Sequence, residues 1–179
     1  MSQPLNEAFQ AFVLEYQDLV FGTAVRLLGN PADAEDVAQT VFLRAFERFA
    51  EVGSHPGRAG WLKTVTTNLC LNHLTRYRAR WQFFSELESG GETQRAFVES
   101  LAAPDPVRDD EGAGERERAL ERALRRLPDH QRVPLVLFHF EERSYQEIAS
   151  LLGVSLAKVK TDIHRGRETL RRALEQGKA

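Results

Sequence analysis

Apolar residues recur every three or four positions through most of this chain, a spacing that predicts helices. The first such stretch runs from Leu5 to Val20, and we expect its helix to end near Gly29. Asn30 and Pro31 then open a second helix, because asparagine suits an N-cap and proline suits the first helical position. The apolar stripe of this helix is Val41, Phe42, Ala45, Phe46 and Phe49. No segment alternates with the period of a strand, so the predicted fold class is all-α.

The same spacing predicts further helices. After a loop from Gly53 to Gly60, a third helix runs from about Trp61 to Arg80, with Leu62, Val65 and Leu69 inward. Two more are expected at Glu115–Leu127 and Asp129–Glu141. Pro134 is awkward in the latter, because a proline beyond the first turn costs a helix about 3 kcal/mol. We therefore expect either a kink or a later helix start near Arg132.

The segment from Ser144 to Arg167 predicts a helix-turn-helix. Ser144 and Glu147 have the spacing of a capping box, and Gly153 ends the short helix where a positive φ is expected. Ser155 then caps a second helix whose Val159 and Ile163 face the first.

The solvent side of that second helix is rich in hydrogen-bond donors, which suit a DNA major groove. They are Lys158, Lys160, Thr161, His164, Arg165 and Arg167. The alternative is an ordinary helical hairpin with a solvated charged face.

A second nucleic-acid signal lies in the third helix. Asn68, Asn72 and Arg76 fall on one stripe beside Trp61. Amides can bond to base edges and an indole can stack on an unpaired base, while Lys63, Arg78 and Arg80 are available for phosphates. Alternatively, Trp61 belongs to the core and the polar residues form a solvated face.

Charge is distributed unevenly along the 179 residues, although the net charge is only −2. Five basic residues and no acidic one lie between Arg58 and Arg80, and seven basic and three acidic ones lie after Ser155. Between Glu86 and Glu111 there are eight acidic and two basic residues, together with Gly90, Gly91, Pro104 and Pro106. This pattern predicts two small helical domains, 1–85 and 113–179, joined by a flexible acidic linker at 86–112.

Other chemistry is weakly supported. The single Cys70 cannot form an internal disulfide and is interpreted as a packing residue. The five histidines lack zinc-ligand spacing, and no phosphate-binding glycine loop is found, so we expect neither a metal nor a cofactor and no enzymatic activity. The N-terminal residues lack the pattern of a signal peptide, and no apolar run is long enough for a membrane span. A soluble cytoplasmic protein without membrane insertion is expected.

Three motifs, in this order, resemble the extracytoplasmic-function (ECF) type of bacterial RNA polymerase sigma factor. They are Asp33–Arg44, Trp61–Leu74, and Leu127–Arg132 leading into the helix-turn-helix. The resemblance covers nearly the whole chain outside the linker. Three residues depart from the family pattern: Thr40 stands where an acid is usual, Ala157 replaces a glycine, and Asp162 stands where arginine is common.

The resemblance implies roles for these residues. Asp36, Gln39 and Thr40 would contact core RNA polymerase. Asn68 and Asn72 would lie near a flipped base of the minus-ten promoter element, with residues 51–60 as the wall that selects it. Lys160, Thr161, His164 and Arg165 would read the minus-thirty-five element as duplex, and Lys158, Arg167 and Arg171 would contact phosphates. Asp162 repels phosphate, so we expect it to point at a cytosine amino group, at a neighbouring arginine or away from DNA. We favour pairing with a neighbouring basic residue such as Lys158, four residues earlier.

The predicted function is therefore that of a sigma factor directing promoter-specific transcription initiation, with core RNA polymerase and double-stranded and locally melted promoter DNA as partners. The resemblance also implies an anti-sigma factor. Two alternatives remain: a sigma-like decoy that binds a sigma antagonist, and a stand-alone helix-turn-helix regulator. A metal-dependent nuclease using Asp109, Asp110 and Glu111 is a more distant one.

Overall fold

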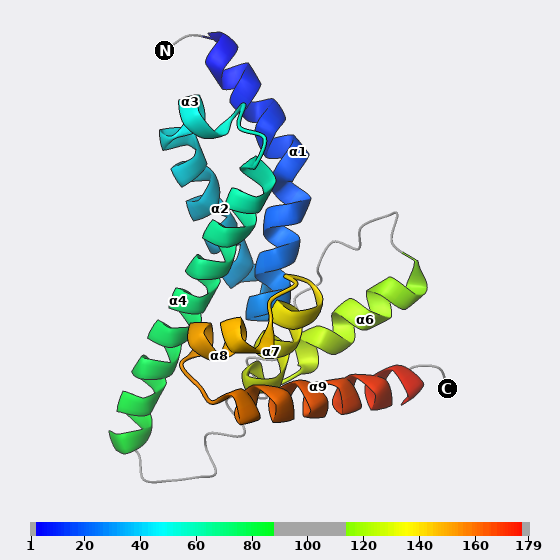
Figure 1. Ribbon diagram of the computed structural model, residues 1–179. Coiled ribbons are helices and arrows are strands. Elements are labelled where there is room, and N and C mark those ends of the chain that lie inside the picture. The colour runs from blue at the N-terminus through cyan, green and yellow to red at the C-terminus, as the bar shows by residue number, and fades with distance from the viewer. Residues whose placement is uncertain (1–2, 88–113, 177–179) are drawn as a thin grey trace. The chain divides into compact units, whose positions relative to one another are not determined.

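The fold is all-α, as predicted, in the part of the chain that the computed structural model describes: residues 3–87 and 114–176, with side chains for 5–76 and 114–176. The helices are α1 (Gln3–Leu28), α2 (Pro31–Glu47), α3 (Phe49–Val52), α4 (Arg58–Leu87), α6 (Glu115–Arg126), α7 (Asp129–His139), α8 (Tyr145–Leu152) and α9 (Leu156–Gln176) (Figure 1). Nearly all of the predicted linker lies outside the described residues, so its flexibility stays a prediction.

The helices form two bodies, which we call the N-terminal body (α1 to α4) and the C-terminal body (α6 to α9). By their contacts the residues separate into units 1–71 and 72–179. Helix α4 is continuous through this division and through residue 85. The predicted domain boundaries therefore stay predictions.

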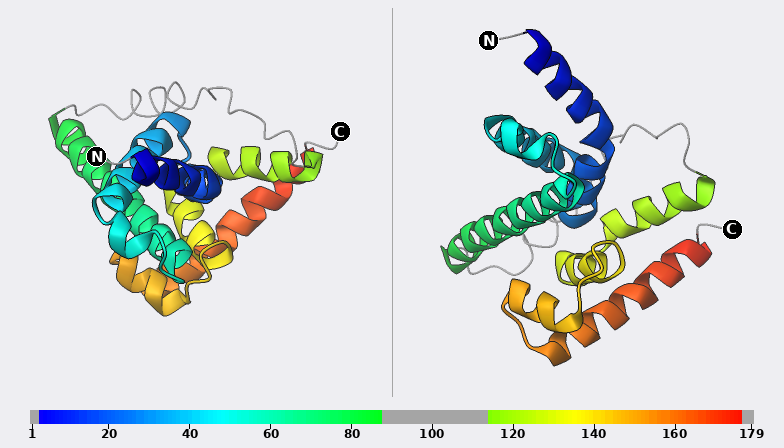
Figure 2. Two further views of the ribbon diagram at one scale, coloured as in Figure 1. Left: turned by 90° about the horizontal axis from the view of Figure 1, so that it is seen from above. Right: turned by 45° about the horizontal axis from the view of Figure 1, so that its top comes forward.

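Helices α1 and α2 lie side by side in the N-terminal body (Figures 1 and 2). The turn between them forms as the sequence predicts. Gly29 takes a φ of 70°, and the Asn30 side chain accepts the N–H groups of Ala32 at 2.9 Å and of Asp33 at 3.4 Å. These bonds satisfy donors that the first turn of a helix leaves without partners.

Aromatic rings fix α3 against α1. The ring of Phe9 lies 4.9 Å from Phe46 and 5.2 Å from Phe49, both edge to face, and Phe12 contacts Phe49 and Tyr16. Such pairs contribute about 0.5–1.5 kcal/mol each beyond the area they bury. The cluster therefore positions the residues that follow α3 in the chain.

Helix α4 begins at Arg58, three residues before the predicted start at Trp61. A tertiary contact explains the difference, because Arg58 Nε donates to Tyr16 Oη of α1 at 2.7 Å. The inward face also differs in part. Leu62 is buried as expected, but Val65 and Leu69 are only half-buried, and the other buried residues are Thr66, Thr67, Cys70 and Leu74.

In the C-terminal body, α7 packs on α8 and α9. Helix α7 begins at Asp129, as the apolar spacing predicts, so the alternative of a later start near Arg132 is wrong. Pro134 lies inside the helix, and a kink stays a prediction. The buried guanidinium of Arg132 explains the early start. It donates to the Leu127 carbonyl at 2.7 Å and pairs with the Asp129 carboxylate at 2.5 Å, which fixes the turn before α7.

Candidate nucleic-acid interfaces

The turn between α8 and α9 has the geometry predicted for a helix-turn-helix. Ser144 Oγ accepts the N–H of Glu147 at 3.2 Å, and the Ser144 N–H donates to the Glu147 carboxylate at 2.7 Å. This backbone hydrogen bond is the main cause that lowers the pKa of Glu147. Gly153 ends α8 in the left-handed region, with a φ of 65°.

Helix α9 presents its basic side chains to solvent. Ser155 Oγ accepts the N–H of Lys158 at 3.2 Å and caps the helix, while Val159 and Ile163 are almost fully buried. The seven side chains predicted to meet the minus-thirty-five element are all exposed: Lys158, Lys160, Thr161, His164, Arg165, Arg167 and Arg171. One face of α9 is therefore available for a ligand.

These seven side chains differ in what already engages them. Lys160, His164 and Arg165 form no ion pair or hydrogen bond with another side chain of the described residues. Thr161 Oγ1 donates to the carbonyl of Ala157 at 3.0 Å, but its oxygen can still accept. These four residues are the ones expected to read bases.

Asp162 pairs with Lys158 as predicted, at 2.8 Å. Asp162 as a whole is only 5% exposed, so its carboxylate is buried in the C-terminal body. Its charge is therefore buried and paired with Lys158, and is not exposed on the surface that carries Lys160 and Arg165. The departure from the family pattern at this position therefore does not place a carboxylate on that surface.

Arg171 and Arg167 lie in neighbouring turns but have different partners. Arg171 binds Glu168 at 3.0 Å and Glu175 at 3.3 Å, and its hydrogen bond to Glu168 lowers the pKa of that carboxyl. Arg167 instead donates from Nε to His139 Nε2 at 3.1 Å, with its guanidinium carbon 5.5 Å from the Phe138 ring centroid.

In the N-terminal body, the polar stripe of α4 reaches solvent. Asn68, Asn72 and Arg76 are exposed, and Lys63 is half-buried. Arg78 and Arg80 belong to α4, but their side chains lie outside the described ones. The predicted stripe therefore exists as an accessible surface as far as residue 76.

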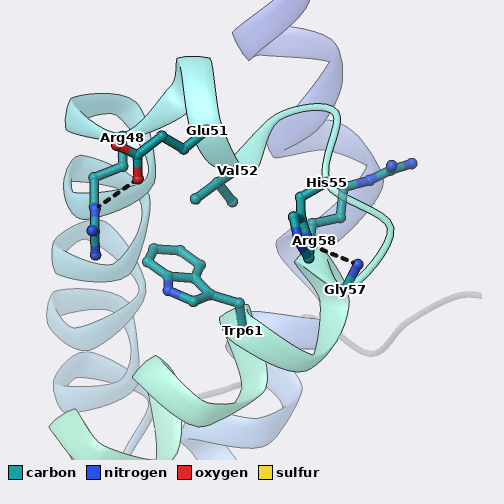
Figure 3. A pocket seen from close by; sticks show the side chains of 7 residues that line it. All are labelled: Arg48, Glu51, Val52, His55, Gly57, Arg58 and Trp61. Atoms are coloured by element: carbon teal, nitrogen blue, oxygen red, sulfur yellow. Dashed lines mark hydrogen bonds and ion pairs between the residues drawn. The ribbon is translucent and has the colours of Figure 1, made fainter.

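A pocket of about 280 Å³ lies where α3, the following loop and α4 meet (Figure 3). Trp61 is half-buried, with its indole on the pocket wall, so it is not a fully buried core residue. His55 Nδ1 accepts the N–H of Gly57 at 2.9 Å and orders the loop. The lining residues are Arg48, Glu51, Val52, His55, Gly57, Arg58 and Trp61.

The sequence resemblance predicted that residues 51–60 form this wall, but it did not predict that Arg48 lines the pocket or that residues of α1 hold Arg58 in place. Arg58 is held by Tyr16 and by Glu15, whose carboxylate lies 3.5 Å away. These contacts join residues more than 40 positions apart, so no local pattern signals them. The pocket wall is fixed by tertiary contacts.

The exposed face of α2 carries the residues predicted to contact polymerase. Asp36 and Gln39 are exposed, and Thr40 is half-buried with its hydroxyl bonded to the Asp36 carbonyl at 2.9 Å. Leu43, seven residues after Asp36, is 64% exposed on the same side of the helix. Sequence reasoning missed this leucine, although its spacing from Asp36 was a usable signal.

The described residues contain neither a metal-ligand cluster nor a helix suited to a membrane. No group of three or more His, Cys, Asp or Glu side chains there could hold a metal ion. None of the helices described is both long enough and apolar enough to cross a membrane.

Together, the capped helix-turn-helix and the basic face of α9 define a DNA-binding protein of the helix-turn-helix class. The family model for sigma-70 region 2 matches residues 12–80, and that for sigma-70 region 4 matches residues 117–170. Both matches fall on the helices that carry the surfaces described above.

Relatives extend the match over most of the chain. It is 30% identical over 170 residues to the ECF RNA polymerase sigma factor SigW of Bacillus subtilis, covering 94% of this chain and 90% of that protein. It is 36% identical over 170 residues to the ECF sigma factor SigE of Mycolicibacterium smegmatis, covering 94% of this chain and 62% of that protein. The solved structure of the Bartonella quintana sigma factor RpoE with the anti-sigma factor NepR is 21% identical, with a TM-score of 0.49, and the match covers 93% of this chain and 96% of that one.

The chain belongs to the ECF group of the sigma-70 family. Members are non-catalytic factors that direct RNA polymerase to promoters, so this protein acts in promoter-specific transcription initiation. Core RNA polymerase and promoter DNA are its partners.

Proposed function

We propose that the C-terminal body reads the minus-thirty-five promoter element as duplex through the exposed face of α9. The observation that carries this proposal is the set of exposed and unengaged side chains on that face, Lys160, His164 and Arg165. A helix following a tight turn can enter the major groove, where such donors bond to base acceptors. Thr161 supplies a further acceptor on the same side.

The N-terminal body captures the minus-ten element as it melts. Asn68 and Asn72 offer amides to base edges, and Trp61 offers a ring for stacking. The pocket beside Trp61, with its volume of about 280 Å³, has room for one unstacked base. Extracting a base costs a few kcal/mol, which the pocket and the polymerase contacts must offset. Lys63, Arg76, Arg78 and Arg80 serve the phosphates of this strand.

The face of α2 docks on core RNA polymerase. Asp36, Gln39 and Thr40 provide polar contacts, and the exposed Leu43 provides an apolar centre for them. An anti-sigma factor that covers these surfaces while polymerase is absent, and a cytoplasmic location, follow from the family resemblance.

In vitro transcription tests the proposal. Purified protein and core polymerase from the source organism are given genomic fragments, and transcripts are compared for wild type, Asn68→Ala, Arg165→Ala and Arg126→Ala. We expect specific transcripts from wild type and much reduced levels from the first two variants. Arg126 is an exposed arginine of α6, so Arg126→Ala is the matched control and should resemble wild type.

Three outcomes would contradict it. No transcript from wild type, despite binding to polymerase, would indicate a decoy. Tight duplex binding without polymerase would indicate a stand-alone regulator. Equal transcription by the Arg165→Ala and Arg126→Ala variants would contradict promoter reading by α9.

A further inference from the structure

Three basic side chains of α9 were assigned to DNA phosphates, yet their charges are not equally available. Lys158 is paired with Asp162 at 2.8 Å, and Arg171 lies between the carboxylates of Glu168 and Glu175. Arg167 has no carboxylate partner among the described residues. Of these three side chains, only Arg167 can therefore attract an anion without first breaking an ion pair with a carboxylate.

The end of α7 nevertheless restrains Arg167. The Phe138 ring lies below the guanidinium, with 5.5 Å between the ring centroid and the guanidinium carbon. Phe138 is itself supported by Tyr145 of α8, whose ring is stacked on it at 4.8 Å. Because the Nε–H is used by His139 Nε2, the two terminal nitrogens remain to bind an outside acceptor.

Such a setting suits a phosphate. A guanidinium binds phosphate through two parallel hydrogen bonds, and fixing its orientation beforehand reduces the side-chain entropy lost on binding. For His139 Nε2 to accept the Arg167 bond, the imidazole must be neutral with its proton on Nδ1. Partial burial, and then the charge of Arg167, lower the pKa of His139 and favour this neutral form.

We propose that Arg167 is the main phosphate contact of the C-terminal body, that Phe138 and His139 are its positioning residues, and that Lys158 and Arg171 contribute far less. This inference rests on the proposed reading of duplex DNA by α9. It assigns a function to the last turn of α7, which lies outside the helix-turn-helix itself.

Duplex binding by the full chain tests the main contact. The probe is a fluorescein-labelled duplex of arbitrary sequence and roughly 20 base pairs, because phosphate contacts do not depend on sequence. Fluorescence anisotropy gives Kd between about 50 and 200 mM salt. Arg167→Ala should weaken binding about tenfold and reduce the steepness of log Kd against log salt by about 0.9.

Arg171→Ala is the matched control, since it removes the same charge from the same helix. We expect it to weaken binding less than about threefold, because its charge is already offset by two carboxylates. Equal losses of affinity and of salt dependence in the two variants would overturn the assignment of Arg167.

A second set of variants tests the positioning residues. His139→Ala should weaken binding roughly threefold to fivefold, and His139→Gln should restore it because the amide oxygen can accept the Arg167 bond. Phe138→Leu, which keeps apolar volume but removes the ring, should also weaken binding. Thermal unfolding midpoints show whether the variants remain folded.

The double variant separates positioning from a general structural effect. In the Arg167→Ala background, His139→Ala should have no further effect, since the side chain it positions is gone. An undiminished effect there would overturn the positioning role of His139. Absence of any duplex binding by wild type, even at low salt, would overturn both this inference and the proposed reading of duplex DNA by α9.

Discussion

Asp162 shows how a single carboxylate can lie on a DNA-binding helix without repelling DNA. Its side chain is buried and holds Lys158, which is half exposed. The ion pair therefore fixes the position of a lysine and cancels most of its charge. Its contribution to stability is moderate, because one partner remains in contact with solvent.

Asp162→Asn should lower the free energy of unfolding by about 1 kcal/mol, measured by urea denaturation, because a charge-assisted hydrogen bond is weakened. The same change frees Lys158 and should strengthen binding to non-specific duplex. Glu117→Gln on α6 removes an equal charge from an exposed site and controls for net charge. An unaltered affinity in Asp162→Asn would mean that Lys158 does not reach DNA.

Glu147 provides a pH-dependent contribution to stability. Its pKa is lowered in the folded protein, first by the Ser144 backbone N–H and then by the Ser144 side chain and the charge of Arg143. A lowered carboxyl pKa stabilises the fold above the ordinary value near 4.5, and this contribution is lost as pH falls through the folded value.

Glu147→Gln should therefore melt below wild type at neutral pH, and the two should converge in acid well below pH 4.5. Glutamine can still complete a capping box, so the comparison isolates the charge. The measurement is the unfolding midpoint by circular dichroism as a function of pH. A difference that does not change with pH would contradict the prediction.

At the scale of the helix, two glycines have opposite roles. Gly153 has a φ of 65° at the end of α8, and a Cβ there would meet no atom within 4 Å. Gly153→Ala should lower the free energy of unfolding by about 1–2 kcal/mol through the left-handed conformation alone. Gly60 lies in α4 with equally open surroundings.

Gly60→Ala is the matched comparison and should raise the free energy of unfolding by up to about 1 kcal/mol, because alanine favours the helix. Both values come from chemical denaturation. Similar effects of the two substitutions would show that backbone conformation at Gly153 is not the controlling factor.

Helix boundaries show where sequence reasoning succeeds and where it fails. The start of α2 and the end of α8 follow from local chemistry, namely the side chain of Asn30 and the flexibility of Gly153, and both were predicted. The start of α4 depends on Arg58 bonding to Tyr16, and the alternative start of α7 near Arg132 is wrong because the turn before Asp129 is held by Arg132 bonding to Leu127. The first contact lies 42 residues away in the chain, and the second requires a buried guanidinium, which local patterns do not predict.

The same distinction applies to the candidate surfaces. The exposed face of α9 was predictable, because Val159 and Ile163 define the buried side and the rest follows from helical spacing. The partners of Arg167 were not predictable, since His139 is 28 residues away and on another helix. Spacing identifies which side chains share a face, while tertiary packing decides which of them are already engaged.

At the scale of the whole molecule, the two bodies should carry separable functions. Leu43→Asp should weaken binding to core polymerase at least tenfold, because a charge is placed at the apolar centre of the α2 face. Duplex binding by the same variant should be unchanged. Affinity for polymerase can be measured by fluorescence anisotropy with the labelled full-length chain.

Leu14→Asp is the matched control, because Leu14 is a similarly exposed leucine, 61% against 64%, on α1. We expect it to bind polymerase as wild type does. Arg165→Ala should show the reverse of Leu43→Asp, with normal polymerase affinity and weakened duplex binding. Loss of both activities in either variant would contradict the separation.

The guanidinium of Arg132 has a consequence for how the C-terminal body comes apart. If the last turn of α6 unfolded, the Leu127 carbonyl would move away and the buried guanidinium of Arg132 would lose a hydrogen-bond acceptor. Such a state has a high free energy. Fraying at that junction is therefore suppressed. Because a protease needs locally unfolded backbone, we expect no cleavage at this junction until the whole C-terminal body unfolds.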